Sequence, residues 1–167
     1  APEHSDLLKL NQLLARAERP FVIAGSAAWS VAGSQALQRF AERYDLPVAS
    51  AFRRQDRFDN AHPCYAGHLG LAIAPQLAAG LRAADVVIVF GQCLNEVTSG
   101  GFALLNGTGS AQKIVLIAAD ADAGSPPFDI ALAISADPVE TAEALAGLPT
   151  PGKTPPWPVW RRDLRRA

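Results

Sequence analysis

The sequence predicts a Rossmann-like open α/β fold, in which helices cover both faces of a mostly parallel sheet. Two observations lead to this prediction. Short segments that are apolar throughout alternate along the chain with segments whose apolar residues recur at helical spacing. Strands that are apolar throughout are typical of parallel sheets, because both faces are buried and the crossover connections are usually helices.

Size and composition fit one such domain. The chain has 167 residues, 49% of them hydrophobic and 19% charged, and its formal net charge is -1. This charge balance argues against a nucleic-acid partner. Two cysteines and three histidines provide neither a disulfide framework nor the spacing of a zinc site. No apolar run reaches the roughly 18 to 20 residues of a membrane span. We therefore expect a cytoplasmic protein that binds neither nucleic acid nor membrane.

The chain begins with a predicted helix and strand. Leucines recur at helical spacing over residues 5–18, and Ser5 or Asp6 is placed to cap the start of this helix. PFVIAG (20–25) follows as a continuously apolar run bounded by Pro20 and Gly25, which indicates a short buried strand.

A second predicted helix and strand come next. The helix presents one apolar stripe, formed by Leu37, Phe40, Ala41 and Tyr44. LPVASAF (46–52) is the strand. Residues 53–73 are expected to be a long irregular connection, and such loops in compact domains are usually functional or interfacial.

The second half repeats the alternation. Residues 74–83 resemble a helix, and ADVVIVFG (84–91) is the clearest buried strand of the chain. KIVLIAAD (113–120) and IALAIS (130–135) are two further strands. DPVETAEALAGL (137–148) is predicted to be a helix with Asp137 as N-cap, Pro138 at the first position and Glu140 completing a capping box. The proline-rich and then basic tail is interpreted as a linker.

Ligands of open parallel sheets bind at the carboxyl ends of the strands, near the point where strand order reverses. The candidate loops therefore follow Gly25, Ala51, Gly91 and Asp120. Gly25 stands where a phosphate loop would begin, but the next glycine comes only at Gly33, so the G-x-G-x-x-G pattern is incomplete. A phosphate loop and a simple strand-ending turn both remain open. Asp120 likewise has two interpretations, a ribose acceptor or a turn cap.

No catalytic apparatus is visible in the sequence. Cys93 follows a strand and a glycine, but no activating partner can be identified from sequence order. His62 and His68 flank Cys64, which suggests a general base or a metal ligand, yet a turn ordered by His62-Pro63, with Tyr65 packing inward, is the favoured interpretation. The carboxylates are dispersed, without a pair at helical or strand spacing.

Five segments in order, RPFVIAG, LPVASAF, HPCYAGHLGLAIAP, ADVVIVFGQ and KIVLIAADAD, resemble the central domain of thiamine diphosphate-dependent enzymes of the acetohydroxyacid synthase and 2-oxo acid decarboxylase group. The match covers nearly the whole chain. Its markers are Arg19-Pro20, Pro47-Val48, His62-Pro63-Cys64-Tyr65-Ala66-Gly67, Leu69-Gly70, and Ala84-Asp85 through Gly91.

The resemblance implies a domain within a longer, homo-oligomeric enzyme. Residues 1–150 would be the central domain, and residues 151–167, with Trp157 and Trp160, would begin a linker toward a C-terminal diphosphate-binding domain. Thiamine diphosphate and Mg²⁺ would be bound by that domain and by an N-terminal pyrimidine-binding domain. The absence of methionine fits an excised segment. We therefore expect this chain alone to be inactive.

Some members of the family bind FAD or ADP in this domain. Carried over by position, the corresponding residues are Gly25, Ser26, Ala27, Ala51, Phe52, Leu71, Gly91, Gln92, Cys93 and Asp120. The chain departs from the pattern at Ser26 and Ala27, where such relatives have glycines, at Cys93 instead of arginine, and at Ala118 instead of an acid. Loss of an arginine removes a fixed phosphate donor. The resemblance thus implies a scaffold with a vestigial nucleotide site.

Two other functions remain open at this point. One is a free-standing NAD- or FAD-binding enzyme of the similar DHS-like fold, such as an NAD-using deacylase, which would need a catalytic histidine in a polar cleft and a fuller glycine signature. The other is an interaction module with an empty site and no catalytic parent. The substrate of a parent enzyme also stays open among acetolactate synthesis, decarboxylation and acyl transfer.

Overall fold

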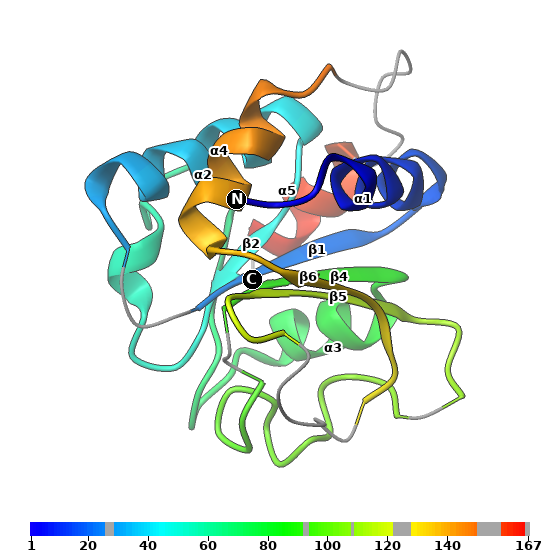
Figure 1. Cartoon of the computed structure of the whole chain (residues 1–167). Coiled ribbons are helices and arrows are strands. Elements are labelled where there is room, and N and C mark those ends of the chain that lie inside the picture. Colours follow the sequence, from blue (N-terminus) through cyan, green and yellow to red (C-terminus); the bar gives the residue numbers. More distant parts are fainter. Residues whose placement is uncertain (26–28, 92–93, 108, 122–127, 150–157, 166–167) are drawn as a thin grey trace.

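A computed structural model describes residues 1–25, 29–91, 94–107, 109–121, 128–149 and 158–165. Its centre is a six-stranded sheet in the order β3-β2-β1-β4-β5-β6, and every neighbouring pair of strands is parallel (Figure 1). The predicted fold class is therefore confirmed. The order reverses between β1 and β4, which places the switch point of the sheet between these two strands.

The strands are short and mostly buried. β1, β2 and β4 are buried along their whole length, as continuous apolar runs of a parallel sheet require. The bounds are β1 (Pro20–Ala24), β2 (Val48–Ser50), β3 (Tyr65–His68), β4 (Val86–Phe90), β5 (Lys113–Ala118) and β6 (Ile130–Ser135). Each predicted strand is thus present: β6 has the predicted bounds and the others have slightly narrower ends.

Among the described residues, two helices connect strands, one precedes the first strand and two follow the last. They are α1 (His4–Arg16), α2 (Val31–Tyr44), α3 (Pro75–Ala83), α4 (Pro138–Gly147) and α5 (Pro158–Arg165), with a 3-10 turn η1 (Gln55–Arg57). The Asp137 side chain caps α4 by accepting from the N–H groups of Val139 (2.8 Å) and Glu140 (3.0 Å), as predicted. The predicted cap of α1 is wrong, because Ser5 and Asp6 lie inside its first turn and Glu3 precedes it without a side-chain hydrogen bond.

Helices cover both faces of the sheet (Figure 1). On one face, α1, α2 and α4 bury the first core cluster, in which Leu10, Leu37 and Phe40 are fully buried. On the other face, α3 packs Leu77 and Leu81 against the sheet, and Leu164 of α5 joins the same core cluster. Because both faces are covered, the polar backbone edge at the carboxyl ends of the strands is where a ligand would approach.

Two elements differ from the sequence prediction. The connection 53–73 contains β3, which the pattern did not indicate because Ala66 is its only buried residue and Gly67 has a φ of +130°. The tail contains α5, which the proline content of the tail concealed. The assignment of residues 151–167 to a linker toward a further domain stays a prediction.

Candidate functional site at the switch point

The loops after β1 and β4 flank the switch point, and their first N–H groups continue the sheet. The Gly25 N–H donates to the Phe90 carbonyl at 2.9 Å, and the Gly91 N–H donates to the Ile117 carbonyl at 2.7 Å. Gly91 has a φ of +85°, a left-handed conformation that favours glycine. Glycine after β4 is thus explained by the backbone turn, without reference to a ligand.

The loop after β2 begins in the same way. The Ala51 N–H donates to the Ala24 carbonyl at 2.8 Å, and Ala51 is buried. An anion bound at the end of a sheet needs free backbone N–H groups. At Gly25, Ala51 and Gly91 these groups are already bonded to the neighbouring strand.

Trp29 is the residue at this site that the sequence analysis missed. Its indole N–H donates to the Gly25 carbonyl, and its ring meets the Phe90 ring edge to face at 6.0 Å between centroids. A Cβ added to Gly33 would lie 3.2 Å from the Trp29 ring. Trp29 therefore packs over the ends of β1 and β4, against the start of α2. The signal was present in FVIAGSAAW, where a large aromatic residue follows the end of a strand.

The amino terminus of α2 is capped by its own chain. The Ser30 hydroxyl accepts the Gly33 N–H at 3.0 Å, and the Ser34 N–H donates to the Ser30 carbonyl at 3.0 Å. A helix amino terminus attracts phosphate through unpaired N–H groups of its first turn. Ser30 already satisfies one of these donors, which weakens this terminus as an anion site.

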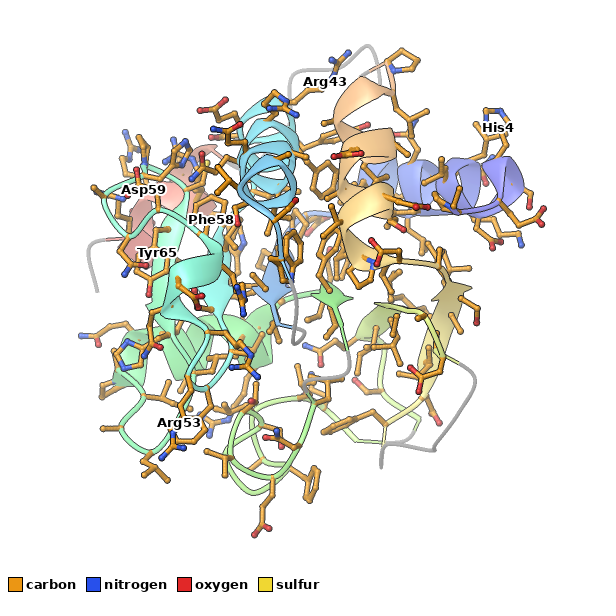
Figure 2. The ribbon with its side chains drawn as sticks, turned by 60° about the vertical axis from the view of Figure 1, so that its left-hand side comes forward. His4, Arg43, Arg53, Phe58, Asp59 and Tyr65 are labelled. Carbon is orange, nitrogen blue, oxygen red and sulfur yellow. The ribbon has the colours of Figure 1, made fainter. Side chains whose placement is uncertain are left out.

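The turn after β2 presents an arginine on an aromatic ring. The Arg53 guanidinium lies 5.1 Å from the centroid of Phe52, and Arg53 has a left-handed φ of +57°. Figure 2 shows Arg53 at the surface, apart from Phe58, Asp59 and Tyr65. A Cβ on Gly70 would lie 2.8 Å from the Phe52 ring, so the two loops are closely packed. Leu71 is 86% exposed.

The remaining candidate residues divide into two groups. Asp120 is exposed in the turn after β5. Ser26, Ala27, Gln92 and Cys93 lie outside the described residues. The described part of the site brings Gly25 and Gly91 together at the switch point with Ala51 beside them, and the Leu71 side chain is exposed at the surface.

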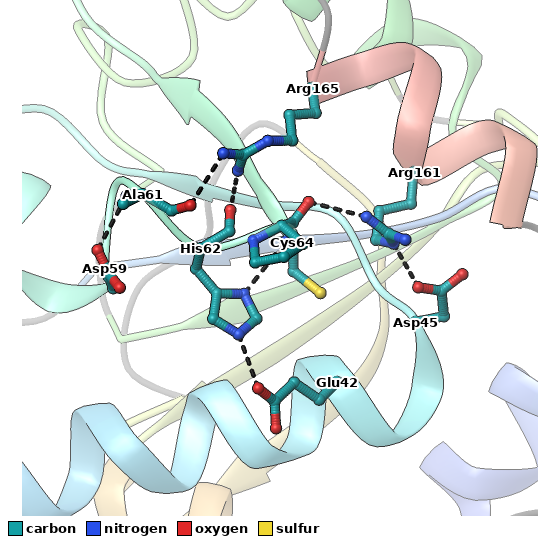
Figure 3. Close-up of polar contacts among 9 residues, drawn as sticks. Glu42, Asp45, Asp59, Ala61, His62, Cys64, Arg161 and Arg165 are labelled. Atoms are coloured by element: carbon teal, nitrogen blue, oxygen red, sulfur yellow. Dashed lines mark hydrogen bonds and ion pairs between the residues drawn. The ribbon is translucent and has the colours of Figure 1, made fainter.

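His62 and Cys64 belong to a structural network before β3 (Figure 3). The His62 Nδ1 accepts the Cys64 N–H at 3.1 Å, so Nε2 carries the proton that faces Glu42 Oε1 at 2.8 Å. Burial raises the pKa of the Cys64 thiol to about 11. A thiol with this pKa stays protonated at neutral pH and is a poor nucleophile. His68 lies at the opposite end of β3, so the two histidines do not form one site.

The sequence interpretation of a turn at His62-Pro63 is confirmed. The Tyr65 N–H donates to the His62 carbonyl at 3.0 Å, and Tyr65 packs against the first core cluster and stacks with Phe58. Among the described residues, no group of three or more His, Cys, Asp or Glu side chains is arranged to hold a metal ion. Within the same ranges, no helix combines the length and the apolar composition needed to span a membrane.

Comparison with known proteins identifies the fold and the family. Residues 7–145 match the model of the thiamine pyrophosphate enzyme central domain. A sulfoacetaldehyde acetyltransferase of Roseovarius nubinhibens is 32% identical over 88 residues, covering 53% of this chain and 15% of the relative. A second, from Alcaligenes xylosoxydans xylosoxydans, is 32% identical over 114 residues, covering 65% of this chain and 18% of the relative.

A solved structure shares the fold. It comes from Mycobacterium smegmatis and is described as a thiamin diphosphate-dependent enzyme; it superposes with a TM-score of 0.66 at 22% identity. The alignment covers 95% of this chain and 30% of that one. The chain therefore spans less than a third of the length of this structure and less than a fifth of the length of the curated relatives.

Proposed function

The chain belongs to the family of thiamine pyrophosphate enzyme central domains, and from this premise we propose that it is a non-catalytic scaffold within a thiamine diphosphate-dependent 2-oxo acid decarboxylase or carboligase, acetolactate synthase-like in its chemistry. The observation that carries the proposal is the family match over residues 7–145, which coincides with the body built from α1 through α4. The parent is proposed to be a cytoplasmic homo-oligomer.

The proposed division of labour places the cofactor in other domains. Thiamine diphosphate, held with Mg²⁺, supplies the stabilised carbanion of such reactions. The cofactor would be bound by pyrimidine- and diphosphate-binding domains on either side, with residues 151–167 leading toward the second. The acetyltransferase relatives add acyl transfer to the parent reactions that this proposal allows.

We further propose that the FAD or ADP site of this domain type is vestigial here. Three contacts support this: the Gly25 and Gly91 N–H groups are bonded within the sheet, the Ser30 hydroxyl occupies a first-turn donor of α2, and Trp29 packs over Phe90. The positions Ser26, Ala27, Ala51, Phe52, Leu71, Gln92, Cys93 and Asp120 complete the proposed remnant.

The first test is the coding sequence on both sides of this segment. We expect an upstream domain that carries a catalytic glutamate and a downstream domain that carries a Gly-Asp-Gly…Asn motif. Stop codons or unrelated domains directly outside the segment would contradict the scaffold proposal. As a second test, the isolated chain is mixed with pyruvate, thiamine diphosphate and Mg²⁺, and acetaldehyde and acetolactate are measured. Product above a heat-killed control would contradict a non-catalytic role.

The vestigial site is tested separately by isothermal titration with FAD, ADP and NAD, together with an absorbance scan of the purified protein. We expect no binding heat and no flavin spectrum. Trp29→Ala, which removes the side chain that packs over the ends of β1 and β4, is titrated with the same three nucleotides for comparison. Micromolar affinity in the unaltered chain that is lost in Gly91→Val would instead establish a working nucleotide site at the switch point.

A further inference from the structure

The described body of the domain carries a receptor surface for its own last helix, α5. The surface lies where β1, β2 and β3 begin, at the edge of the sheet opposite to the switch point. It consists of an apolar notch at Gly80 in α3 and of polar acceptors at Pro20, Asp45 and residues 61–63.

The notch accepts Leu164. This side chain is 5% exposed, and a Cβ added to Gly80 would lie 2.2 Å from its Cδ2 atom. Glycine lowers the stability of a helix interior relative to alanine, so Gly80 needs a packing reason. The close approach of Leu164 provides that reason.

Trp160 anchors the other end of the contact. Its indole N–H donates to the Pro20 carbonyl at 2.9 Å, and its ring packs against both core clusters. Trp160 and Leu164 are four residues apart, so they share one face of α5.

Two arginines form a parallel polar row. Arg161 pairs through Nε with the Asp45 carboxylate, at the end of α2, and donates through Nη1 to the Pro63 carbonyl at 2.8 Å (Figure 3). Arg165 donates to the carbonyls of His62 and Ala61, the latter at 2.9 Å. Charged donors make stronger hydrogen bonds than neutral ones. In contrast, Val159 is 56% exposed.

We propose that α5 is a docked strap that the surface of Gly80, Pro20, Asp45 and residues 61–63 recognises through the pattern Trp-Arg-x-x-Leu-Arg. The strap contacts α3 on one face of the sheet and the end of α2 on the other. It also holds the turn from which the edge strand β3 starts, and β3 pairs with β2 in a register that shifts after Val48.

The strap determines where the chain leaves the domain. Any segment that follows would depart from the end of α5, at a fixed place beside β3, instead of from residue 150. Only this consequence for a following domain rests on the proposed function, because the docking itself is a property of the present chain.

Hydrogen exchange of the 167-residue chain, read by mass spectrometry, tests the docking without any flanking domain. We expect amides of residues 160–165 to be protected. Leu164→Ala and Gly80→Leu should each accelerate their exchange at least about tenfold, the change that corresponds to ~1.4 kcal/mol of lost docking. Exchange in residues 61–68 should rise in parallel, while β4 and β5 stay protected. Val159→Ala is the control and should change nothing.

Two further readouts separate docking from a general loss of stability. Gly80→Leu in the Leu164→Ala background should accelerate exchange less than it does alone, because the side chain it collides with is absent. The effects of Arg161→Ala and Asp45→Ala on the exchange of residues 160–165 should be non-additive, because the two variants remove the same ion pair. Exchange of 160–165 in the unaltered chain as fast as in the free peptide would overturn the proposal. An acceleration confined to β4 and β5 would also overturn it.

Discussion

The Asp85 carboxylate accepts the backbone N–H of Arg19 at 2.9 Å, across 66 residues of sequence. Its second oxygen accepts the Glu18 N–H at 2.6 Å, and the Asp85 N–H donates back to the Arg19 carbonyl at 3.1 Å. The carboxylate thereby fixes the entry of β1 beside the entry of β4. The sequence markers Arg19-Pro20 and Ala84-Asp85 are two halves of this one structural joint.

Asp85→Ala should lower the free energy of unfolding by about 1–2 kcal/mol, because two backbone donors lose their acceptor. Urea denaturation followed by circular dichroism measures the loss. Asp85→Asn retains one acceptor oxygen and should lose less. Equal stability of all three proteins would show that water replaces the carboxylate at no cost.

Gly91→Ala should lower the free energy of unfolding by about 1–2 kcal/mol, since a φ of +85° is unfavourable for a residue with a Cβ. Thermal unfolding provides the measurement. Gly147→Ala is the matched control, because a Cβ there meets no atom within 4 Å and alanine favours the helix by up to about 1 kcal/mol. A neutral Gly91→Ala would mean that the loop relaxes out of the left-handed conformation.

Gln112 joins three segments from a buried position. Its amide donates to the carbonyls of Leu81 (3.0 Å) and Ala84 (2.8 Å), at the end of α3, and its oxygen accepts the Asn106 N–H at 2.9 Å. Gln112→Ala should destabilise the protein by about 1–3 kcal/mol, because buried groups lose their partners. Urea denaturation is again the measurement, with the exposed helix residue Gln35→Ala as a control that stays within about 0.5 kcal/mol.

Cys64 should react slowly with iodoacetamide in the folded protein. Its thiol pKa is raised from 9.0 to about 11, chiefly by burial, so at pH 8 its thiolate fraction falls about a hundredfold. The measurement is alkylation followed by mass spectrometry in a Cys93→Ser background, compared with the same protein in urea. Equal rates in both states would contradict a buried thiol.

The same pKa shift makes the protein less stable at high pH. The unfolded thiol releases its proton near pH 9 while the folded thiol retains it to about pH 11, so the stabilisation is complete below pH 9 and is lost as pH rises toward 11. The loss should be about 1–3 kcal/mol. Cys64→Ala should show a correspondingly smaller decrease between pH 8 and pH 11 in urea denaturation. Parallel pH profiles of the two proteins would rule out this linkage.

Local patterns determined much of this fold. The stripe of Leu37, Phe40, Ala41 and Tyr44 predicted α2 because helical spacing is a property of neighbouring residues, and all four side chains are buried. The Asp137 cap was predictable for the same reason, because the side chain of an N-cap residue bonds N–H groups two and three residues later. The continuous apolar runs of β1, β4 and β5 predicted these strands without any knowledge of the strands with which they pair.

Only the tertiary structure decided the features that depend on contacts between distant segments. β3 is a strand because β2 offers it an edge, although its own four residues carry no apolar pattern. Trp29 lies at the switch point because its ring packs against Phe90 at the end of β4, a contact that the sequence does not reveal. α5 follows a proline-rich stretch, and the notch at Gly80 that receives Leu164 is 84 residues earlier in the chain. Sequence spacing encodes local periodicity, whereas the partner of an edge strand, of an aromatic ring in a loop or of a terminal helix is supplied by the folded chain.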